Sequence, residues 1–349
     1  MTESMNSQLP VSFALIPVII AFVTTLVAMP VIRVVALRCG FVDRPGELKI
    51  HTSAIPRLGG AALVAGLGLA MGLAPAGWRL DNALLLVLGI TWLLGICDDI
   101  RSIPAIIRLA IQLMAGSLVW LAGAGLQISG NGLVDLAITA LFFSFSVNAW
   151  NLLDGMDGLA LSVAAVAALG FASLFYIVGY AAGLLLALVT FSVSAAGLFY
   201  NKPPASIFIG DSGSTLLGAI FAILSLSWVH EVSSERSLLV PLLVVAIPLC
   251  DALAAMIRRV RGGKSPLSGD RSHFYDLLLG QNWTVRLILT VSAAATACLA
   301  ALGVIVARGI VDAGWTAFAA ATAICVLGAL MGSFARQRNE IERRSCESR

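Results

Sequence analysis

Carboxylate and amide side chains gather in a few short stretches of this chain, each beside a long apolar run. The adjacent pair Asp98 and Asp99 forms one stretch, residues Asn148 to Asp157 form a second, and Asp211 stands in a third. Adjacent carboxylates repel one another unless a cation or solvent lies between them. Mg²⁺ prefers oxygen ligands and is commonly bound by one or two carboxylates together with substrate phosphates. The chemistry indicated is a metal-assisted reaction of a phosphate compound.

The second stretch has the most regular spacing. Asn148, Asn151 and Asp154 recur every third residue, so on a helix they span an arc of roughly 120°. Gly155 then lets the chain turn and approach a ligand closely, and Asp157 follows it. Polar side chains at such depth in an apolar chain are functional by default. The alternative is helix capping and turn chemistry.

The other two stretches also have plainer explanations. Asp98 and Asp99 could be solvated acids in a short loop, or could cap a helix that starts near Ile103. Asp211 lies in FIGDSGS, where backbone amides at a helix N-terminus favour phosphate and a carboxylate favours a metal that bridges it. Its alternative is a plain N-cap. Three such stretches on one face of the protein favour a shared site.

A basic loop, RRVRGGKSPLSGDRSHFYD at residues 258–276, carries cations that complement polyphosphate. Arg271 offers bidentate hydrogen bonds to phosphate, and His273 can donate one or exchange a proton. Asp270, beside them, is grouped with the expected substrate contacts. The alternative is that the loop is basic only because it faces the cytoplasm. We prefer this explanation for the three arginines before the glycines, Arg258, Arg259 and Arg261.

Two charged residues fall inside predicted spans. Arg108 could bind phosphate as Arg271 does, or could only extend its guanidinium to the membrane surface. Asp251 is either a buried acid paired with a basic residue or backbone donor, or a residue that orients the last cytoplasmic loop toward substrate. Both alternatives stay open at both positions.

The elements that must position these residues are membrane-spanning helices. The 349-residue chain is 59% hydrophobic and 12% charged, with a mean hydropathy of +0.96. Its apolar blocks, roughly 17 to 25 residues each, can cross a hydrocarbon core of about 30 Å. Backbone groups cannot stay unpaired in lipid, so the spans must be helices. We predict an all-α polytopic membrane protein with one transmembrane domain, a core at 12–335 and a polar cytoplasmic tail at 336–349.

We predict about eleven spans, with boundaries read from hydropathy. They lie near 12–36, 58–76, 82–97, 105–125, 133–150, 159–177, 181–199, 214–230, 237–257, 285–307 and 315–335.

The distribution of lysine and arginine orients the chain. With the N-terminus outside, only Arg79, Arg236 and Arg308 of the 22 basic residues fall on the outer side. The positive-inside rule therefore predicts an outer N-terminus and a cytoplasmic C-terminus. This orientation puts the acidic stretches on the cytoplasmic face. The net charge of +3 reflects orientation, and no nucleic-acid partner is expected.

Four motifs in order resemble those of the polyprenyl-phosphate N-acetylhexosamine-1-phosphate transferases: DD, N-x-x-N-x-x-D-G-x-D-G-L-A, F-x-G-D-x-G-S and S-P-x-S-x-D-R-x-H. The resemblance runs from about Val42 to Gly280 and includes the loop VDRPGELKIHTSAIPRLGG. It implies transfer of a sugar 1-phosphate from a UDP-sugar to a polyprenyl phosphate such as undecaprenyl phosphate, with release of UMP. It also implies a bacterial-type inner membrane and the first membrane step of cell-surface polysaccharide synthesis, such as O-antigen or cell-wall polymers.

The same resemblance implies residue roles. Asp211 would hold Mg²⁺, or Mn²⁺ in its place, with Asn151 as second ligand. Asp98 and Asp99 match a pair assigned either to metal binding or to deprotonating the lipid phosphate. A phosphate monoester is already mostly dianionic at neutral pH, with a second pKa of about 6. We therefore favour positioning or electrostatics over an obligatory base for this pair.

Further roles follow for the remaining positions. Gly155 and Asp157 match positions that read uracil, and Arg271 and His273 match positions near the pyrophosphate. The full expected set is catalytic Asp98, Asp99, Asp154 and His273, metal-binding Asp211 and Asn151, and substrate-binding Asn148, Gly155, Asp157, Arg108, Arg271, Asp270 and Asp251.

The chain departs from its relatives at one point. Where they continue the last motif with further histidines, it reads His273, Phe274, Tyr275 and Asp276. UDP-GlcNAc or another UDP-N-acetylhexosamine is the expected donor, and a phospho-MurNAc-pentapeptide transferase of peptidoglycan synthesis is the alternative. A secondary transporter is the alternative from another class, but broken midplane helices and internal repeats would be expected for it. The oligomeric state, a homodimer included, stays open.

Overall fold

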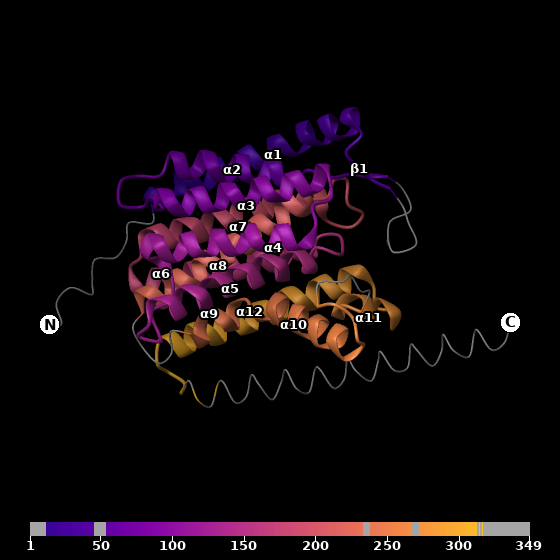
Figure 1. Cartoon of the computed structure of the whole chain (residues 1–349). Helices are drawn as coiled ribbons and strands as arrows, with labels where there is room; N and C mark the ends of the chain where they lie inside the picture. The colour runs from indigo at the N-terminus through magenta and orange to yellow at the C-terminus, as the bar shows by residue number, and fades with distance from the viewer. Residues whose placement is uncertain are drawn as a thin grey trace.

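The structure is a computed structural model that describes residues 12–44, 54–232, 238–266, 272–312, 314 and 316. Long helices run side by side through these residues (Figure 1). The helices are α1 (Ser12–Cys39), α2 (Gly60–Gly72), α3 (Asn82–Ile100), α4 (Ala105–Val119), the π-helical turn η1 (Trp120–Ala124), α5 (Gly132–Leu153), α6 (Leu159–Val178), α7 (Ala181–Asn201), α8 (Gly210–Glu231), α9 (Leu239–Val244), α10 (Ala246–Arg261), α11 (Phe274–Gly280) and α12 (Val285–Ala307). The predicted helical class is confirmed.

Eight helices in the described part of the chain are long and apolar enough to cross a membrane. They are α1, α3, α4 with η1, α5, α6, α7, α8 and α12. Large apolar side chains such as Leu15, Ile16 and Ile19 stay exposed along α1, as lipid-facing positions would. The chain is a multi-pass membrane protein, and eight of the predicted spans have a matching helix.

Of the other three predicted spans, two differ from the prediction. The span at 58–76 contains only α2, whose 13 residues reach about 20 Å at about 1.5 Å per residue, short of a hydrocarbon core of about 30 Å. The span at 237–257 consists of two helices, α9 and α10, instead of one. The span at 315–335 lies outside the described residues.

Proline accounts for the break between α9 and α10. Val245 stands between them with φ −100° and ψ 16°. Pro248 has no N–H to donate to the carbonyl of Val244, and its ring clashes with that carbonyl. The break could not be predicted from hydropathy alone, because the residues on both sides of it form one continuous apolar run.

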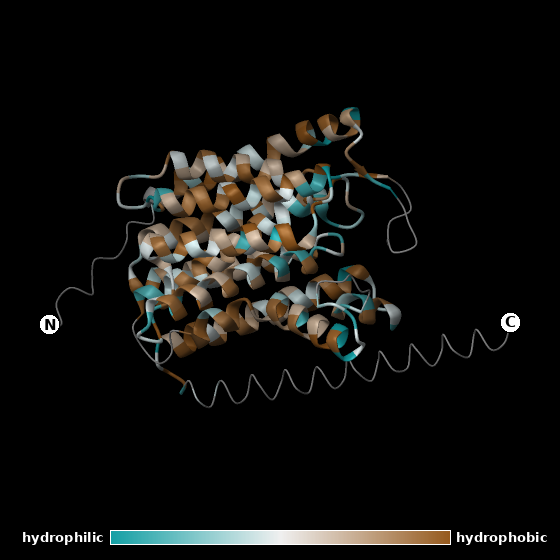
Figure 2. Cartoon of the chain, viewed as in Figure 1, coloured by the Kyte–Doolittle hydropathy of each residue, from teal (hydrophilic) through white to brown (hydrophobic). Residues whose placement is uncertain are grey.

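The core is built around α8. Every residue from Ser212 to Trp228 is buried, and α8 packs against α3, α5, α2 and α7. Trp150 of α5 stacks on Phe221 of α8, with ring centroids 4.3 Å apart and an interplanar angle of 7°. Many small residues in α8 allow close helix packing. Figure 2 shows apolar residues along the helices and hydrophilic ones gathered at their ends.

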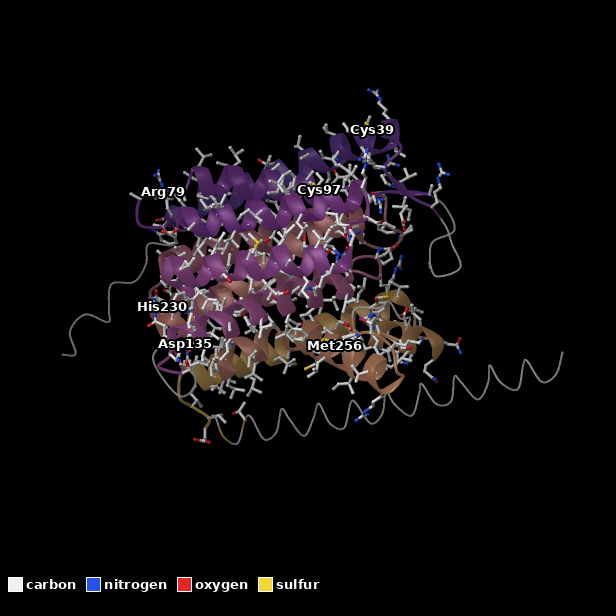
Figure 3. The ribbon with its side chains drawn as sticks, in the orientation of Figure 1. Cys39, Arg79, Cys97, Asp135, His230 and Met256 are labelled. Carbon is white, nitrogen blue, oxygen red and sulfur yellow. The ribbon has the colours of Figure 1, made fainter. Side chains whose placement is uncertain are left out.

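One end of the bundle collects the predicted motifs. α3 and α5 end there and α8 begins there, beside β1 (Val42–Asp43) and α11 (Figure 1). β1 pairs antiparallel with β2 (Ile55–Pro56), with Val42 opposite Pro56. Figure 3 places Cys39, the last residue of α1, at this end and Arg79 and His230 at the opposite end. The acidic residues of the predicted motifs thus lie where these apolar helices begin or end.

Candidate active site

The N-terminus of α8 is capped by a carboxylate from another helix. Asp99 accepts hydrogen bonds from the backbone N of Asp211 and of Ser212, each at 2.9 Å. Its side chain is buried. The first N–H groups of a helix lack intrahelical partners and favour negative charge. Asp99 therefore joins α3 to α8, and Asp211 is not the plain N-cap that the sequence allowed.

Gly210 makes this junction possible. Its φ of +69° is a left-handed conformation, and a Cβ there would lie 2.6 Å from Oδ1 of Asp99. A larger residue would be strained and would displace that carboxylate. α8 thus begins four residues before the predicted start at 214, so Asp211 lies in its first turn.

Asp211 and Asn151 lie together, although 60 residues separate them in the sequence. Nδ2 of Asn151 donates to Oδ1 of Asp211 at 2.7 Å and to the hydroxyl of Ser214 at 3.0 Å. Asp98 and Asp99 are close enough to act on the Asp211 carboxylate. The three predicted acidic stretches therefore meet at one place.

Asp98 closes the loop between α3 and α4. Oδ1 accepts a hydrogen bond from the backbone N of Ile103 at 2.6 Å, and Oδ2 forms an ion pair with Arg108. Asp98 therefore binds the loop before α4 and does not cap that helix, which begins at Ala105 with no side-chain cap. Arg108 is partly exposed and pairs with Asp98, so it does more than reach for the membrane surface.

Asp154 is the C-cap of α5 and faces other acids. Burial, and then the charges of Asp211, Asp99 and Asp157, raise its pKa well above the usual value for an aspartate. A cation in this acidic cluster would favour the ionised form, because it would offset the repulsion among the carboxylates. The cluster is thus chemically suited to a bound cation.

The turn after α5 is anchored to the loop between α7 and α8. Asp157 accepts a hydrogen bond from the backbone N of Ala205 at 2.9 Å. Asn201 accepts one from the backbone N of Gly158 and donates one to the carbonyl of Ile207, each at 3.0 Å. Asn201 could not be recognised from the sequence, where its only signal is an amide at the end of an apolar run. Its two contacts fix the turn that carries Asp157.

Asn148 faces a polar network between α4 and α5. Its Nδ2 donates to Oε1 of Gln112 at 2.6 Å and to the carbonyl of Ser144 at 2.8 Å. The Ser144 hydroxyl donates to the same Gln112 oxygen at 3.2 Å. Gln112, a buried amide within an apolar run, was likewise not predicted from the sequence. Buried polar groups need such partners, and a substrate contact at Asn148 stays a prediction.

His273 and Asp251 form a buried pair. Nδ1 of His273 lies 2.6 Å from Oδ2 of Asp251, whose Oδ1 accepts a hydrogen bond from the backbone N of Phe274 at 3.0 Å. Asp251 is therefore paired, as one alternative held, and its contacts hold the start of α11 against α10. Orientation of the loop toward substrate, the other alternative, stays a prediction.

Tyr275 attaches α11 to the end of α5. Its hydroxyl donates to the carbonyl of Leu152 at 3.2 Å, and its ring stacks on the ring of His273 with centroids 5.5 Å apart. A Cβ at Gly155 would collide with this hydroxyl. Packing therefore requires glycine at position 155, and contact with uracil there stays a prediction. The predicted residues Asp270 and Arg271 lie outside the described residues.

The donor set fits a hard divalent cation. Where the structure describes the chain, no three His, Cys, Asp or Glu side chains are grouped as ligands of one metal ion. Mg²⁺ needs no such group, because one or two carboxylates and substrate phosphates commonly hold it. Asp211, the neighbouring carboxylates and the Asn151 amide offer oxygen atoms, which suit Mg²⁺ or Mn²⁺ better than softer metals.

Known proteins are similar to this chain over most of its length. Residues 82–229, from α3 to α8, match the sequence model of Glycosyl transferase family 4. The chain is 30% identical over 288 residues to the probable undecaprenyl-phosphate N-acetylglucosaminyl 1-phosphate transferase of Bacillus subtilis (strain 168), covering 78% of this chain and 79% of the relative.

Enterobacterial relatives are similar to the same extent. The undecaprenyl-phosphate alpha-N-acetylglucosaminyl 1-phosphate transferase of Escherichia coli (strain K12) is 30% identical over 291 residues, covering 78% of each chain. The protein of the same name in Salmonella typhimurium is 31% identical over 310 residues, covering 83% of each chain. Because these alignments span most of both partners, the chain belongs to glycosyl transferase family 4.

Proposed function

We propose that this protein transfers N-acetylglucosamine 1-phosphate, or the 1-phosphate of another N-acetylhexosamine, from a UDP-sugar to undecaprenyl phosphate. The products are UMP and a polyprenyl-diphosphate sugar, the first membrane intermediate of a cell-surface polysaccharide such as O-antigen. The names of the relatives support this reaction. The observation that carries it is the meeting of Asp98, Asp99, Asn151, Asp154 and Asp211 at one end of the bundle.

Phosphoryl transfer depends mainly on positioning and on neutralising charge. Asp211 and Asn151 are the proposed ligands of Mg²⁺, or of Mn²⁺ in its place, which when bound would neutralise charge on the phosphoryl group. Asn151 already contacts Asp211 and so lies beside the same position. Arg108, paired with Asp98, places a cation at the edge of the cluster.

The remaining acids take different roles in this proposal. Both oxygens of Asp99 are occupied by backbone amides of α8, which favours positioning over proton transfer. Asp98 also has two partners, Ile103 and Arg108. Asp154, whose pKa is raised by burial and by neighbouring carboxylates, is better suited to hold or give up a proton beside the phosphates.

Substrate recognition is proposed for the surrounding residues. Gly155 and Asp157, with Asn148 nearby on α5, would read the nucleotide. His273, with Arg271 and Asp270 from the same loop, would contact the pyrophosphate. Asp251 would act through His273.

We further propose that the site faces the cytoplasm of a bacterial inner membrane, with an outer N-terminus, a cytoplasmic C-terminus and one transmembrane domain. The positive-inside distribution of lysine and arginine supports this orientation. UDP-sugars would then reach the site from the side on which they are made.

The test is UMP release by purified protein with undecaprenyl phosphate and a panel of UDP-sugars, including the MurNAc-pentapeptide donor, in Mg²⁺ or EDTA. Asp211→Asn is the control. Turnover that needs lipid and metal and disappears in the variant supports the transferase and names its sugar. If folded protein releases no UMP from any donor, the proposal is wrong, and uptake by proteoliposomes then tests transport.

A further inference from the structure

Arg57 lies in the short segment between β2 and α2, and this segment is held against the start of α8. The backbone N–H of Phe208 donates a hydrogen bond to the carbonyl of Pro56 at 2.8 Å, and the carbonyl of Phe208 accepts a hydrogen bond from the backbone N–H of Gly59 at 2.9 Å. Arg57 pairs with Phe208 in a parallel bridge and donates its own backbone N–H to Phe41 at 3.1 Å. The backbone of Arg57 therefore has a fixed place beside the acidic cluster.

The side chain of Arg57 is only partly exposed and acts electrostatically on Asp99, the carboxylate that caps α8. Its Nε is buried and has no hydrogen-bond partner. Within the described part of the chain, its guanidinium makes no hydrogen bond or ion pair. Two other arginines at this end differ, because Arg33 donates to the carbonyl of Ser206 at 3.1 Å and Arg108 pairs with Asp98.

A guanidinium in this position is suited to phosphate. Arginine stays charged at all relevant pH values and presents five N–H donors in a fork that matches phosphate oxygens. Leaving a buried donor without a partner costs free energy, which a bound anion would offset. The neighbouring carboxylates Asp98, Asp99, Asp154 and Asp211 would otherwise repel a phosphorylated substrate. Asp99 acts on Arg57 through its charge, and no hydrogen bond or ion pair joins these two described side chains.

We propose that Arg57 binds a phosphoryl oxygen of a substrate, an inference that rests on the transferase function proposed above. Because Arg57 is held beside the start of α8 and acts on Asp99, its guanidinium would orient the phosphate relative to Asp211. Both substrates carry this chemistry, the lipid as a phosphate monoester and the nucleotide sugar as a pyrophosphate. Separate titrations of the two substrates identify the one that Arg57 binds.

The experiment compares Arg57→Gln and Arg57→Lys with the wild type. Arg101→Gln is the matched control, because Arg101 is an exposed arginine that directly follows α3 at the same end of the bundle. The KM for each substrate is measured with the other saturating, together with kcat and the Tm in detergent. We expect Arg57→Gln to raise the KM of one substrate by roughly ten- to a hundredfold, the range for a hydrogen bond to a charged group. Arg57→Lys should recover part of this loss, and Arg101→Gln should change neither KM.

Binding without turnover separates this inference from the proposed reaction. UDP-sugar binding is measured by titration calorimetry, and binding of undecaprenyl phosphate by retention on nanodiscs that contain it. Weaker binding of one ligand to Arg57→Gln, at an unchanged Tm, supports the inference even if the wild type releases no UMP. If both ligands bind as they do to the wild type, or if only the Tm falls, Arg57 is a counter-ion of Asp99 and the inference is overturned.

Discussion

Oδ2 of Asp251 lies 2.6 Å from Nδ1 of His273, and both side chains are buried. A carboxylate at Nδ1 favours the tautomer with its hydrogen on Nδ1 and fixes the orientation of the ring. The other ring nitrogen, Nε2, lies on the side away from Asp251. Asp251 lies in α10, and His273 directly precedes α11. The pair therefore also holds the start of α11 against α10.

We predict that Asp251→Asn lowers kcat by about 10- to 100-fold, the usual effect of losing a carboxylate that orients a functional imidazole. The asparagine can no longer favour the same tautomer, although its shape is preserved. Steady-state UMP release measures the effect. The double variant with His273→Ala should be no slower than His273→Ala alone. Additive losses would mean that Asp251 acts independently of His273.

Asp99→Asn should lower both stability and activity. The asparagine amide would place an N–H donor against a backbone N–H of α8, leaving a buried donor unpaired at a cost of about 1–3 kcal/mol. Thermal unfolding in detergent and UMP release measure the two effects. Asp211→Asn is the comparison, because it removes one charge from an acidic cluster and should abolish activity without lowering the Tm. An inactive Asp99→Asn protein with an unchanged Tm would instead favour Asp99 as a base.

Gly155→Ala should strongly reduce activity, because the new methyl group collides with the Tyr275 hydroxyl. Overpacking of this kind typically costs about 1–3 kcal/mol and would displace α11 with His273. The same substitution in a Tyr275→Ala background should cost much less, since the obstructing ring is gone. UMP release by the four proteins of this cycle measures the difference. An equal loss in both backgrounds would show that position 155 contacts the substrate directly.

The pH–rate profile should depend on Asp154 and on metal concentration. Burial and three neighbouring acids raise its pKa, so the carboxyl ionises at a higher pH than an ordinary aspartate. If the ionised form is active, activity rises with pH through this raised pKa. A divalent cation favours the charged form, so more Mg²⁺ should move the rising limb to lower pH. Profiles of kcat/KM at low and high Mg²⁺ test this, and the limb should be absent in Asp154→Asn.

Several features of this protein could be predicted from its sequence because they depend on local properties. Apolar runs in a chain this hydrophobic must form helices, since lipid offers no partner for open backbone groups. Burying polar groups in such a chain costs free energy, so the polar groups that are present usually have a function. The acids at the helix ends therefore indicated the site. The N-x-x-N-x-x-D spacing therefore placed Asn151 and Asp154 correctly at the end of α5.

Tertiary structure alone decided which groups meet. Asp99 finds its partners 112 and 113 residues away at the start of α8, and Asn148 turns to Gln112 instead of to the cluster. Helical periodicity tells which residues share a face but not which neighbour that face contacts. Contacts between distant residues depend on how the helices pack, and packing is set by the whole set of side chains together. For the same reason Arg57, ordinary in the sequence, stands beside Asp99 in the folded protein.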